Sequence, residues 1–252
     1  MAHRDYQKDF YSLCTGVRDE QSRQSTAEKI RFVLKEVLDL DLTTSICIDV
    51  GCASGSVTSS LSGLFKMTVG VEYDSVALAD VQKNNQDFNV YFVRGDALKL
   101  PIPDQSCDFI LCLQVYEHVV DDGTLIDEIY RVLRPGGQVY FSGPNKLFPI
   151  EPHYHLLFLH WLPERASASY LRITGKGEIY YERSRTYWGL RTLTSRFEFS
   201  DMTGEVLRYK MAQAAPDFIG KVIRRLPVWI MTSMSPFLPN FNWILTKPTS
   251  HN

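Results

Sequence analysis

Three acidic residues stand at points where apolar stretches of the chain end. Asp49 comes directly before a turn that carries Gly51 and Gly55. Glu72 and Asp96 follow two later apolar stretches. A carboxylate can accept both hydroxyl protons of a ribose, accept from an exocyclic amine, or hold an ammonium group. A single acid of this kind could equally be a solvated loop residue or a helix cap. Together with a glycine turn, the three indicate a pocket for a nucleoside with a cationic tail.

The glycine turn lies in the stretch ICIDVGCASG, residues 46–55. A short apolar run is followed by Gly51, Cys52 and Gly55, and a helical pattern begins at once. Glycine allows positive φ and a close approach of ligand to backbone, and a helix N-terminus offers unpaired N–H groups. The spacing lacks two of the glycines of the dinucleotide fingerprint G-x-G-x-x-G. The pattern therefore predicts a strand, a turn and a helix that bind something other than a dinucleotide.

Alternating strands and helices must bring these acids together. Strands are predicted at 45–50, 67–71, 90–93, 108–113, 138–142, 197–199 and 242–246, and helices at 25–40, 56–65, 75–85, 121–133 and 186–197. Ser25 and Thr26 with Glu28 resemble a capping box at the start of the first helix. Strict alternation predicts a Rossmann-like α/β fold, a doubly wound, mostly parallel seven-stranded sheet. Ligands of such sheets bind beyond the carboxyl ends of the strands.

Changes in composition along the chain suggest three parts. Residues 1–143 are predicted to hold N-terminal helices and the nucleoside-binding core, with residues 1–24 as an arm or short helix over the site. Residues 144–184 are rich in proline, histidine and aromatic residues, which predicts an α-rich lid insertion. Residues 185–252 are predicted to complete the core fold and to carry an amphipathic segment at 219–239.

Composition excludes some classes of protein. The 252 residues are 44% hydrophobic with a formal net charge of -2, which suits one domain with or without a lid and argues against a nucleic-acid partner. Five cysteines without a CxxC pair predict reduced thiols. The polar start predicts no signal peptide, and no apolar run reaches the length of a membrane span. We therefore expect a cytoplasmic protein, with membrane association as a further option.

Four stretches resemble the class I SAM-dependent methyltransferases, type 11 or quinone-methyltransferase-like group. They are IDVGCASG (48–55), VGVEYD (69–74), GDALKLPIPDQSCDFILCLQVYEHV (95–119) and RVLRPGG (131–137). The resemblance implies S-adenosyl-L-methionine (SAM) as cofactor and S-adenosyl-L-homocysteine as product. It implies Asp49, Gly51 and Gly55 around the methionine part. The other implied contacts are Glu72 at the ribose, Asp96 and Ala97 at the adenine, Tyr73 beside the purine, and Cys52, Leu113, Gln114 and His118 along the tail and mouth.

Methyl transfer to an oxygen calls for a base as well as alignment of the reacting atoms. The lid offers Glu151-Pro152-His153-Tyr154-His155 and then His160. We expect His153 or His155 to deprotonate an acceptor hydroxyl, with His118 near the mouth of the pocket. The alternatives are hydrogen bonding within the lid, or a metal site built from the same histidines. Class I transfer needs no metal, so the prediction is that none is bound.

The acceptor is less clearly marked. The lid stretch NKLFPIEPHYHLLFLHWLP is similar to methyltransferases of glycans, glycolipids or secondary metabolites, which implies a small-molecule, sugar or lipid-linked acceptor with a hydroxyl. Two alternatives stay open: a C-methyltransferase acting on a quinone- or prenyl-type acceptor, and a non-catalytic SAM-binding regulatory protein. The fourth strand ends in Leu113-Gln114-Val115-Tyr116 and lacks the Asn/Asp-Pro-Pro-aromatic motif of amino-group methylators.

The segment 219–239 mixes basic residues with an apolar run that contains Trp229. Such a segment can lie on a membrane surface, or it can pack against the sheet and the lid. Peripheral membrane contact is therefore one predicted partner, and the oligomeric state is left open.

Overall fold

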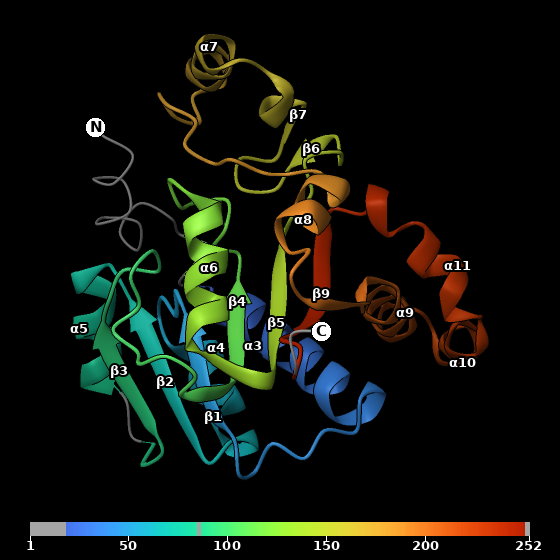
Figure 1. Ribbon diagram of the computed structural model, residues 1–252. Helices are drawn as coiled ribbons and strands as arrows, with labels where there is room; N and C mark the ends of the chain where they lie inside the picture. The colour runs from blue at the N-terminus through green and yellow to red at the C-terminus, as the bar shows by residue number, and fades with distance from the viewer. Residues whose placement is uncertain (1–18, 85–86, 250–252) are drawn as a thin grey trace.

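A seven-stranded sheet forms the centre of the computed structural model, which describes residues 19–84 and 87–249 (Figure 1). Its strands lie in the order β3-β2-β1-β4-β5-β9-β8. β9 runs antiparallel to both of its neighbours, and the other pairs are parallel. The strands are β1 (Ile46–Val50), β2 (Met67–Glu72), β3 (Val90–Arg94), β4 (Cys107–Leu113), β5 (Leu133–Pro144), β8 (Glu198–Asp201) and β9 (Asn240–Thr246). The prediction of a mostly parallel, Rossmann-like doubly wound sheet is confirmed.

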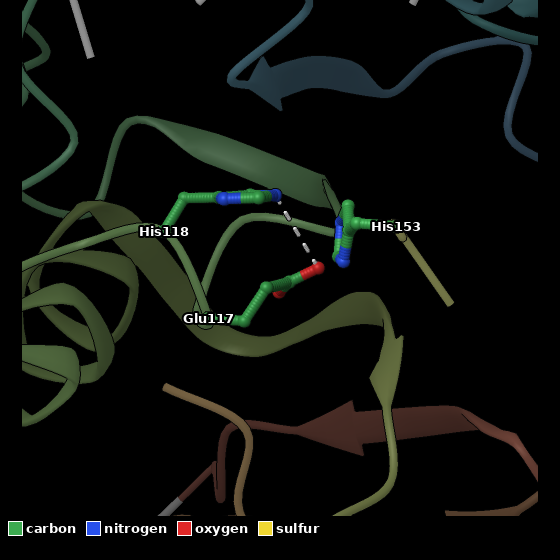
Figure 2. Close-up of side chains that lie close together, drawn as sticks. All are labelled: Glu117, His118 and His153. Carbon is green, nitrogen blue, oxygen red and sulfur yellow. Dashed lines mark ion pairs between the residues drawn. The ribbon is translucent and has the colours of Figure 1, made fainter. Parts of the chain in front are cut away.

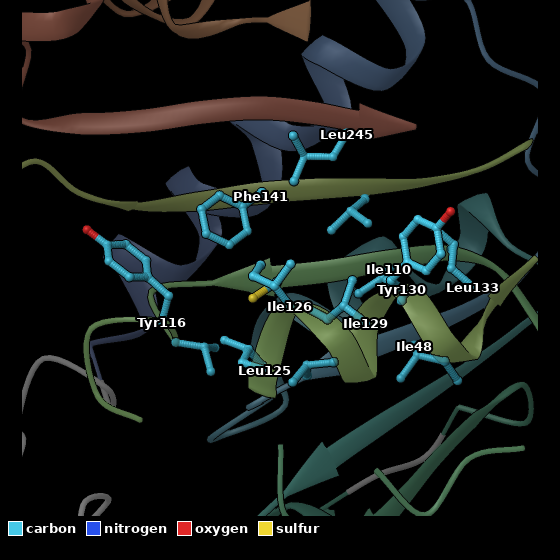
Figure 3. Close-up of a cluster of buried hydrophobic side chains, with 14 of the residues drawn as sticks. Ile48, Ile110, Tyr116, Leu125, Ile126, Ile129, Tyr130, Leu133, Phe141 and Leu245 are labelled. Carbon is cyan, nitrogen blue, oxygen red and sulfur yellow. The ribbon is translucent and has the colours of Figure 1, made fainter. Parts of the chain in front are cut away.

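Helices cover both faces of this sheet and bury its apolar side chains. On one face, α6 (Asp122–Val132) and α8 (Tyr187–Leu193) pack over the strands, and Figure 3 shows Leu125 and Ile126 of α6 against Phe141 of β5. On the other face lie α3 (Glu20–Phe32), α4 (Ser56–Leu61) and α9 (Thr203–Ala214). α5 (Ser75–Asn84) packs against β3. Each large apolar side chain buried in these layers contributes about 1.5–3 kcal/mol.

The register of the parallel strands brings the predicted site residues to one edge. Val50 of β1 lies beside Val71 of β2 and beside Cys112 of β4. The residues that follow, Gly51 and Glu72 among them, therefore emerge at the same level. Glu72 is in turn paired with Arg94 of β3, two residues before Asp96. The carboxyl ends of four neighbouring strands meet here, as the strand pattern predicted.

The first helix differs from its prediction. It begins at Glu20 with Asp19 at its N-cap, and its last turns, Val33–Val37, are wound as a π-helix, η2. The predicted capping box was wrong, because Ser25 and Thr26 lie inside the helix and the Thr26 hydroxyl donates to the Ser22 carbonyl at 3.0 Å. No glycine or proline interrupts residues 19–38, so the helix can extend in both directions. Most of the arm predicted over residues 1–24 lies outside the described residues.

Other boundaries also moved. β5 begins at Leu133, because Arg134-Pro135-Gly136-Gly137, predicted to close the preceding helix, joins the strand instead. The helix predicted at 186–197 is shorter, Tyr187–Leu193, and the strand predicted at 197–199 is β8, at Glu198–Asp201. A 3-10 turn, η3 (Ser62–Leu64), follows α4. The four described cysteines, Cys47, Cys52, Cys107 and Cys112, are buried free thiols.

Between β5 and α8 the chain forms a small separate segment, which stands above one end of the sheet in Figure 1. We keep the name lid for it, and its role as a lid stays a prediction. It contains the two-stranded ribbon of β6 (Ile150–Glu151) and β7 (Leu156–Leu157), then η4 (Leu159–Trp161) and α7 (Glu164–Thr174). After α9 come α10 (Asp217–Arg225), α11 (Val228–Ser233) and η5 (Ser235–Phe237). Among the described residues, no helix is both long enough and apolar enough to cross a lipid bilayer.

Candidate active site

A pocket with about 640 Å³ of empty space opens over the carboxyl ends of β1, β2, β3 and β4. This figure includes space open to solvent. Glu72 and Asp96 line the same pocket, which the nucleoside hypothesis required. The other predicted residues on its wall are Gly51, Tyr73, Ala97, Gln114 and His118.

The backbone holds the carboxylate of Glu72 in place. One oxygen, Oε1, accepts from the N–H groups of Tyr73 and Asp74, both at 2.8 Å, and Oε2 accepts from the Ala53 N–H at 2.7 Å. Burial raises the pKa of Glu72 although these hydrogen bonds oppose the shift. Each carboxylate oxygen has two lone pairs, so Oε2 keeps one for a ligand hydroxyl. A grip on both ribose hydroxyls would require one backbone bond to open.

Asp49 does not line this pocket. Its side chain lies on the face covered by α4, where it accepts from the Thr58 hydroxyl at 2.5 Å. Burial raises the pKa of Asp49 to about 7, and the hydrogen bond from Thr58 and the charge of Arg23 on α3 act in the opposite direction. The predicted contact of Asp49 with an ammonium group stays a prediction.

Cys52, Gly55 and Leu113 lie behind the wall of the pocket. Cys52 packs in a small cluster with Phe92 of β3. Gly55 caps α4 with φ +70°, and a Cβ there would lie 2.3 Å from Val81 and 2.8 Å from Phe92. Close packing of the turn against α5 and β3 is therefore enough to require this glycine. Leu113 packs on the α3 and α4 side of the sheet. The predicted ligand contacts of these three residues stay predictions.

Gln114 has an unusual backbone conformation. Its φ is +56°, although it is not a glycine, and its N–H donates to the Ser142 carbonyl at 2.7 Å. A left-handed residue of this kind costs of order 1–3 kcal/mol and persists where its surroundings fix it, often at functional sites. The turn directs the chain after β4 across the pocket, where Val115 and His118 complete the wall.

Glu117, His118 and His153, which we call the histidine cluster, lie together at the edge of the pocket (Figure 2). The His118 Nε2 lies 3.7 Å from Oε1 of Glu117, and the two imidazole rings meet edge to face with centroids 4.9 Å apart. His118 comes from the turn after β4, whereas His153 comes from the lid. The fold therefore joins a lid histidine to the wall of the nucleoside pocket.

Buried carboxylates surround His153. Glu151 is fully buried, accepts from the backbone N–H groups of His153 at 2.9 Å and Tyr154 at 2.7 Å, and has its second oxygen 2.9 Å from His153 Nδ1. Burial alone would lower the pKa of His153, but the hydrogen bond with Glu151 and the charges of Glu117 and Glu182 outweigh it and raise the pKa to about 9. His153 therefore carries a proton at neutral pH.

Glu117 faces both histidines from a fully buried position. No described residue gives either of its carboxylate oxygens a hydrogen bond. Burial raises the pKa of Glu117 to about 8; the charge of His153 lowers it, and those of Glu182 and Glu151 add to the rise. A buried polar group without a hydrogen bond is costly. Glu117 does not line the pocket, so it can influence a bound molecule only through the histidines beside it.

The other lid histidines lie elsewhere. His155 is exposed, with φ +52°. His160 is buried, and its Nε2 lies 2.7 Å from the Phe148 carbonyl. The predicted set is therefore divided, with His118 and His153 together and His155 apart. The Glu151-Pro152-His153 spacing was a usable signal for the ion pair, whereas nothing in the sequence pointed to Glu182.

One group of possible metal ligands stands out in the described part of the chain. Glu117, His118 and His153 offer one ligand atom each, all within 4.8 Å of one another. This differs from the alternative considered on sequence, which combined His153 with His155 and His160. The prediction that the reaction needs no metal stays a prediction.

Residues 48–141 match the model of a family described as a methyltransferase domain. A "Probable S-adenosylmethionine-dependent methyltransferase" from Mycolicibacterium smegmatis is 31% identical over 100 residues, 40% of this chain and 38% of the relative. A ubiquinone biosynthesis O-methyltransferase from Pseudomonas entomophila is 31% identical over 103 residues, 39% of this chain and 44% of the relative. The match thus spans less than half the length of these relatives.

Solved structures share the fold at low sequence identity. The YcgJ protein from Bacillus subtilis superimposes with a TM-score of 0.55 at 14% identity, covering 88% of this chain and 99% of its own. The phosphoethanolamine N-methyltransferase 2 of Haemonchus contortus, solved with S-adenosyl-L-methionine, gives 0.59 at 17% identity, covering 98% of this chain and 60% of its own. At such identities the likeness concerns the fold alone.

Proposed function

Because residues 48–141 form a class I SAM-dependent methyltransferase domain of the type 11 group, we propose that this protein methylates a hydroxyl oxygen of a small-molecule, sugar or lipid-linked acceptor. The observation that carries the choice of oxygen is the histidine cluster at the edge of the nucleoside pocket. A hydroxyl is a weak nucleophile and needs a base, which a positioned histidine can supply.

The pocket fits S-adenosyl-L-methionine. Glu72 has a lone pair left for the ribose, Tyr73 offers a ring face to the purine, and Asp96 stands at the next strand end. A Cβ at Gly51, where φ is +71°, would lie 2.9 Å from the Val115 side chain on the pocket wall. When bound, the cofactor supplies a sulfonium methyl group whose S–C bond breaks in an in-line displacement, leaving S-adenosyl-L-homocysteine.

His118 is the base in this proposal, because it is the member of the histidine cluster that lines the pocket. The acceptor oxygen forms its bond to the methyl carbon while its proton passes to His118. Glu117 lies 3.7 Å from His118 Nε2. Because burial raises the pKa of Glu117 to about 8, it is largely neutral at pH 7 and offers the ring a full negative charge only at higher pH. His153, protonated and held by Glu151, is a positioning residue that meets the His118 ring edge to face and joins the lid to the core.

Two rival functions make different demands on the same site. C-methylation of a quinone- or prenyl-type acceptor starts from a carbon nucleophile and depends less on a base. A SAM-binding regulatory protein would need the pocket but not the histidine cluster. The buried, carboxylate-flanked histidine pair favours oxygen as the acceptor atom, since both rivals leave the pair without a task.

The His118→Ala substitution tests the proposal. We expect turnover to fall by roughly 10²–10⁴-fold, the usual contribution of a general base, while calorimetry finds S-adenosyl-L-homocysteine bound within a few fold of its original affinity. Turnover is measured as transfer of the label from methyl-labelled SAM to compounds in cell extracts. Mass spectrometry then identifies which neutral, hydroxyl-bearing compounds have been methylated. The matched control is His155→Ala, an exposed lid histidine outside the cluster, which should keep full activity.

If His118→Ala keeps full turnover with the cofactor bound, the base is elsewhere and C-methylation gains ground. Tight cofactor binding with no methylated product in any extract would instead favour the regulatory protein. The same assay repeated in EDTA tests the metal prediction. Loss of turnover in EDTA, restored by a divalent cation, would show that the reaction needs a metal, with the histidine cluster as the candidate site.

We also propose that the protein contacts membranes peripherally while residing in the cytoplasm. Phe218 on α10 is 78% exposed and Trp229 on α11 is 71% exposed. Lys221, Arg224 and Arg225 are exposed on the same α10. Apolar side chains beside basic ones suit an anionic membrane surface, and four buried free thiols suit a reducing compartment.

A further inference from the structure

Large apolar side chains are exposed on neighbouring elements from the lid to α11. The lid contributes four of them, α8 and η5 contribute one each, and α11 contributes three. All are between 37% and 71% exposed: Leu157, Phe158, Trp161, Leu162, Trp188, Phe237, Trp229, Ile230 and Met234. We call this set the apolar belt. Exposed apolar side chains are ordinary when scattered singly, but a connected group marks an interaction surface.

Contacts between neighbouring elements connect the parts of the belt. The side chain of Asn145, at the start of the lid, donates to the Pro236 and Leu238 carbonyls at 2.8 Å and 2.9 Å. These two residues flank Phe237, whose ring meets the ring of Trp188 edge to face with centroids 6.4 Å apart. η5 itself follows α11 directly in the chain. The lid, α8, η5 and α11 therefore hold their exposed rings next to one another.

The lid end of the belt contains a strained residue. Phe158 has φ +59°, where a bulky side chain is rarely found, and such a residue costs of order 1–3 kcal/mol. Its ring lies against that of Trp161 with centroids 4.8 Å apart, and the Trp161 Nε1–H donates to the Lys146 carbonyl. The chain thus holds an aromatic pair at its surface in spite of backbone strain, which is typical of binding segments.

Tryptophan is concentrated in the belt. Three of the four tryptophans of the chain, Trp161, Trp188 and Trp229, belong to it, whereas Trp243 is buried in the sheet. An indole ring is apolar but carries one N–H donor, so tryptophan is enriched where an apolar phase meets water. The belt therefore suits a partner that has an apolar interior and a polar surface.

The charges near the belt favour a lipid bilayer as this partner. The belt and the adjoining α10 lie within residues 144–163, 187–193 and 218–246, which contain a single acid, Glu151, although the whole chain has 29 acidic residues. Glu151 is fully buried. Exposed basic residues lie in the same stretches, among them Lys146, Arg224 and Arg225. Such a surface complements anionic lipids, whereas a second copy of the chain would bring like charges together.

The lid end of the belt adjoins the histidine cluster. In the two-stranded ribbon Leu157 pairs with Ile150, and Leu156 pairs with Glu151. The first pair is exposed and the second is buried, because successive residues of a strand point to opposite faces. The buried Glu151 holds His153 of the cluster at 2.9 Å. A lid that rests on a bilayer would therefore place the histidine cluster directly behind the contacting surface.

We propose that the apolar belt rests on an anionic membrane and that the acceptor is a lipid-linked molecule taken from this surface. Its hydrocarbon chain stays in the bilayer while its hydroxyl-bearing head reaches the histidine cluster. As an assignment of the acceptor class, this rests on the proposed methyl transfer. It also extends the membrane contact proposed for α10 and α11 to the lid, an extension for which a water-soluble acceptor would have no use.

Fluorescence quenching by brominated lipids tests which part of the protein enters the bilayer. Vesicles of phosphatidylcholine and phosphatidylglycerol are used with and without bromine on the acyl chains. The variant Trp229→Phe keeps two exposed tryptophans, Trp161 and Trp188, both outside α10 and α11. We expect it to lose emission to the brominated lipid. The reciprocal variant Trp161→Phe/Trp188→Phe, in which Trp229 is the exposed tryptophan, should lose emission as well.

Vesicle binding measures what the lid contributes. Phe158→Ser should lower the bound fraction about tenfold, because it removes one large apolar side chain from the contact. The matched control is Ile173→Ser, since Ile173 lies on α7 of the lid and is 84% exposed but does not belong to the belt. This control should bind vesicles as the unchanged protein does.

The acceptor class is tested separately, by incubating extracts with methyl-labelled SAM and dividing the products between chloroform and water. The proposal expects label in the chloroform phase. It is overturned if label enters water-soluble products alone, if Trp229→Phe is not quenched, if Phe158→Ser and Ile173→Ser bind vesicles equally, or if light scattering shows a dimer that Phe158→Ser separates. Label in water-soluble products leaves the proposed methyl transfer standing. Absence of label from both phases counts against that transfer, and the quenching still decides whether the belt meets the membrane.

Discussion

At the scale of single residues, Glu72 is the group most fully prepared for a ligand. Three backbone N–H groups fix its carboxylate at the pocket wall, so a ribose meets an acceptor that is already oriented. Glu72→Gln removes the charge and puts an amide donor against those N–H groups. Hydrogen bonds to charged groups contribute about 1.5–3 kcal/mol, so S-adenosyl-L-homocysteine should bind roughly 10–100-fold more weakly in calorimetry.

The control for this substitution is Asp127→Asn. Asp127 is an exposed acid on α6 that pairs with Arg196 at 2.6 Å, and exposed pairs contribute little. The Asp127→Asn variant should bind S-adenosyl-L-homocysteine with the same affinity as the unchanged protein. Equal affinity for Glu72→Gln and Asp127→Asn would remove Glu72 from the cofactor site.

The histidine cluster predicts how stability varies with pH. The pKa of Glu117 rises to about 8 and that of His153 to about 9, so the folded state binds these protons more tightly than the unfolded chain does. Their contribution to stability is present below the ordinary pKa values and is lost as pH rises through about 8 and about 9. The melting temperature should therefore fall between about pH 6 and pH 9.5.

Glu117→Gln identifies the source of this slope. Glutamine stays neutral at every pH and also removes one charge that raises the pKa of His153. Scanning fluorimetry at several pH values should show a smaller decrease for the variant, whose melting temperature at high pH should exceed that of the unchanged protein. Parallel curves for the two proteins would mean that the protons are held by other groups.

The nucleoside pocket could be predicted from sequence because its residues follow directly from strand ends. Glu72 and Asp96 each stand at the end of an apolar run. The parallel register of the strands then places both acids at the same edge of the sheet. The histidine cluster could not be predicted in this way. His118 and His153 are joined by the path of the lid, and the lid has no hydrophobic period from which that path could be derived.

At the scale of elements, the buried strands were the most predictable part. Their apolar runs are short and bounded by glycine, proline or acidic residues, which leaves few alternatives. Helix ends depended on contacts beyond the local pattern. Ile30 and Leu34, for example, are buried by α4 and the sheet, so the first helix extends through a local capping signature. The short helices after α9 were not resolved one by one, although Phe218 and Val222 of α10 stand at helical spacing. Prolines at 216, 227 and 236 divide this part of the chain into pieces too short for a clear period.

Two glycines near the first turn differ in whether the structure requires glycine at their positions. Gly55 has φ +70°, and a Cβ there would lie 2.3 Å from Val81, whereas Gly63 has nothing within 4 Å and no positive φ. Gly55→Ala adds both backbone strain and overpacking, at a cost of about 2 kcal/mol or more. Gly63→Ala should be near neutral. Urea unfolding measures both, and similar midpoints for the two variants would contradict this account of the turn.

At the scale of the whole molecule, the lid is fastened to the core at both of its ends. Asn145 and Arg185, at the two ends, form a backbone bridge. Arg185 also pairs with Asp122 at the start of α6, and its N–H donates to the Tyr116 hydroxyl at 3.2 Å. Tyr116 precedes Glu117 in the chain, and the Arg183 N–H donates to the Glu117 carbonyl at 2.8 Å. The same fastening that closes the lid therefore sets the geometry of the histidine cluster, so the lid and the catalytic proposal depend on each other.

The last prediction concerns the surface formed by α10 and α11, which lies at the opposite side of the molecule from β3 in Figure 1. Vesicles of phosphatidylcholine with phosphatidylglycerol should sediment the protein, and added salt should weaken this binding because exposed charges are screened. Phe218→Ser should lower the bound fraction about tenfold or more, since burying a phenylalanine side chain contributes about 1.5–3 kcal/mol.

Phe88→Ser, next to β3, is the matched control, because Phe88 is 99% exposed yet does not belong to α10 with its basic residues. Equal loss in both variants would indicate nonspecific adhesion, and no sedimentation of the unchanged protein would show that this surface faces water or another protein.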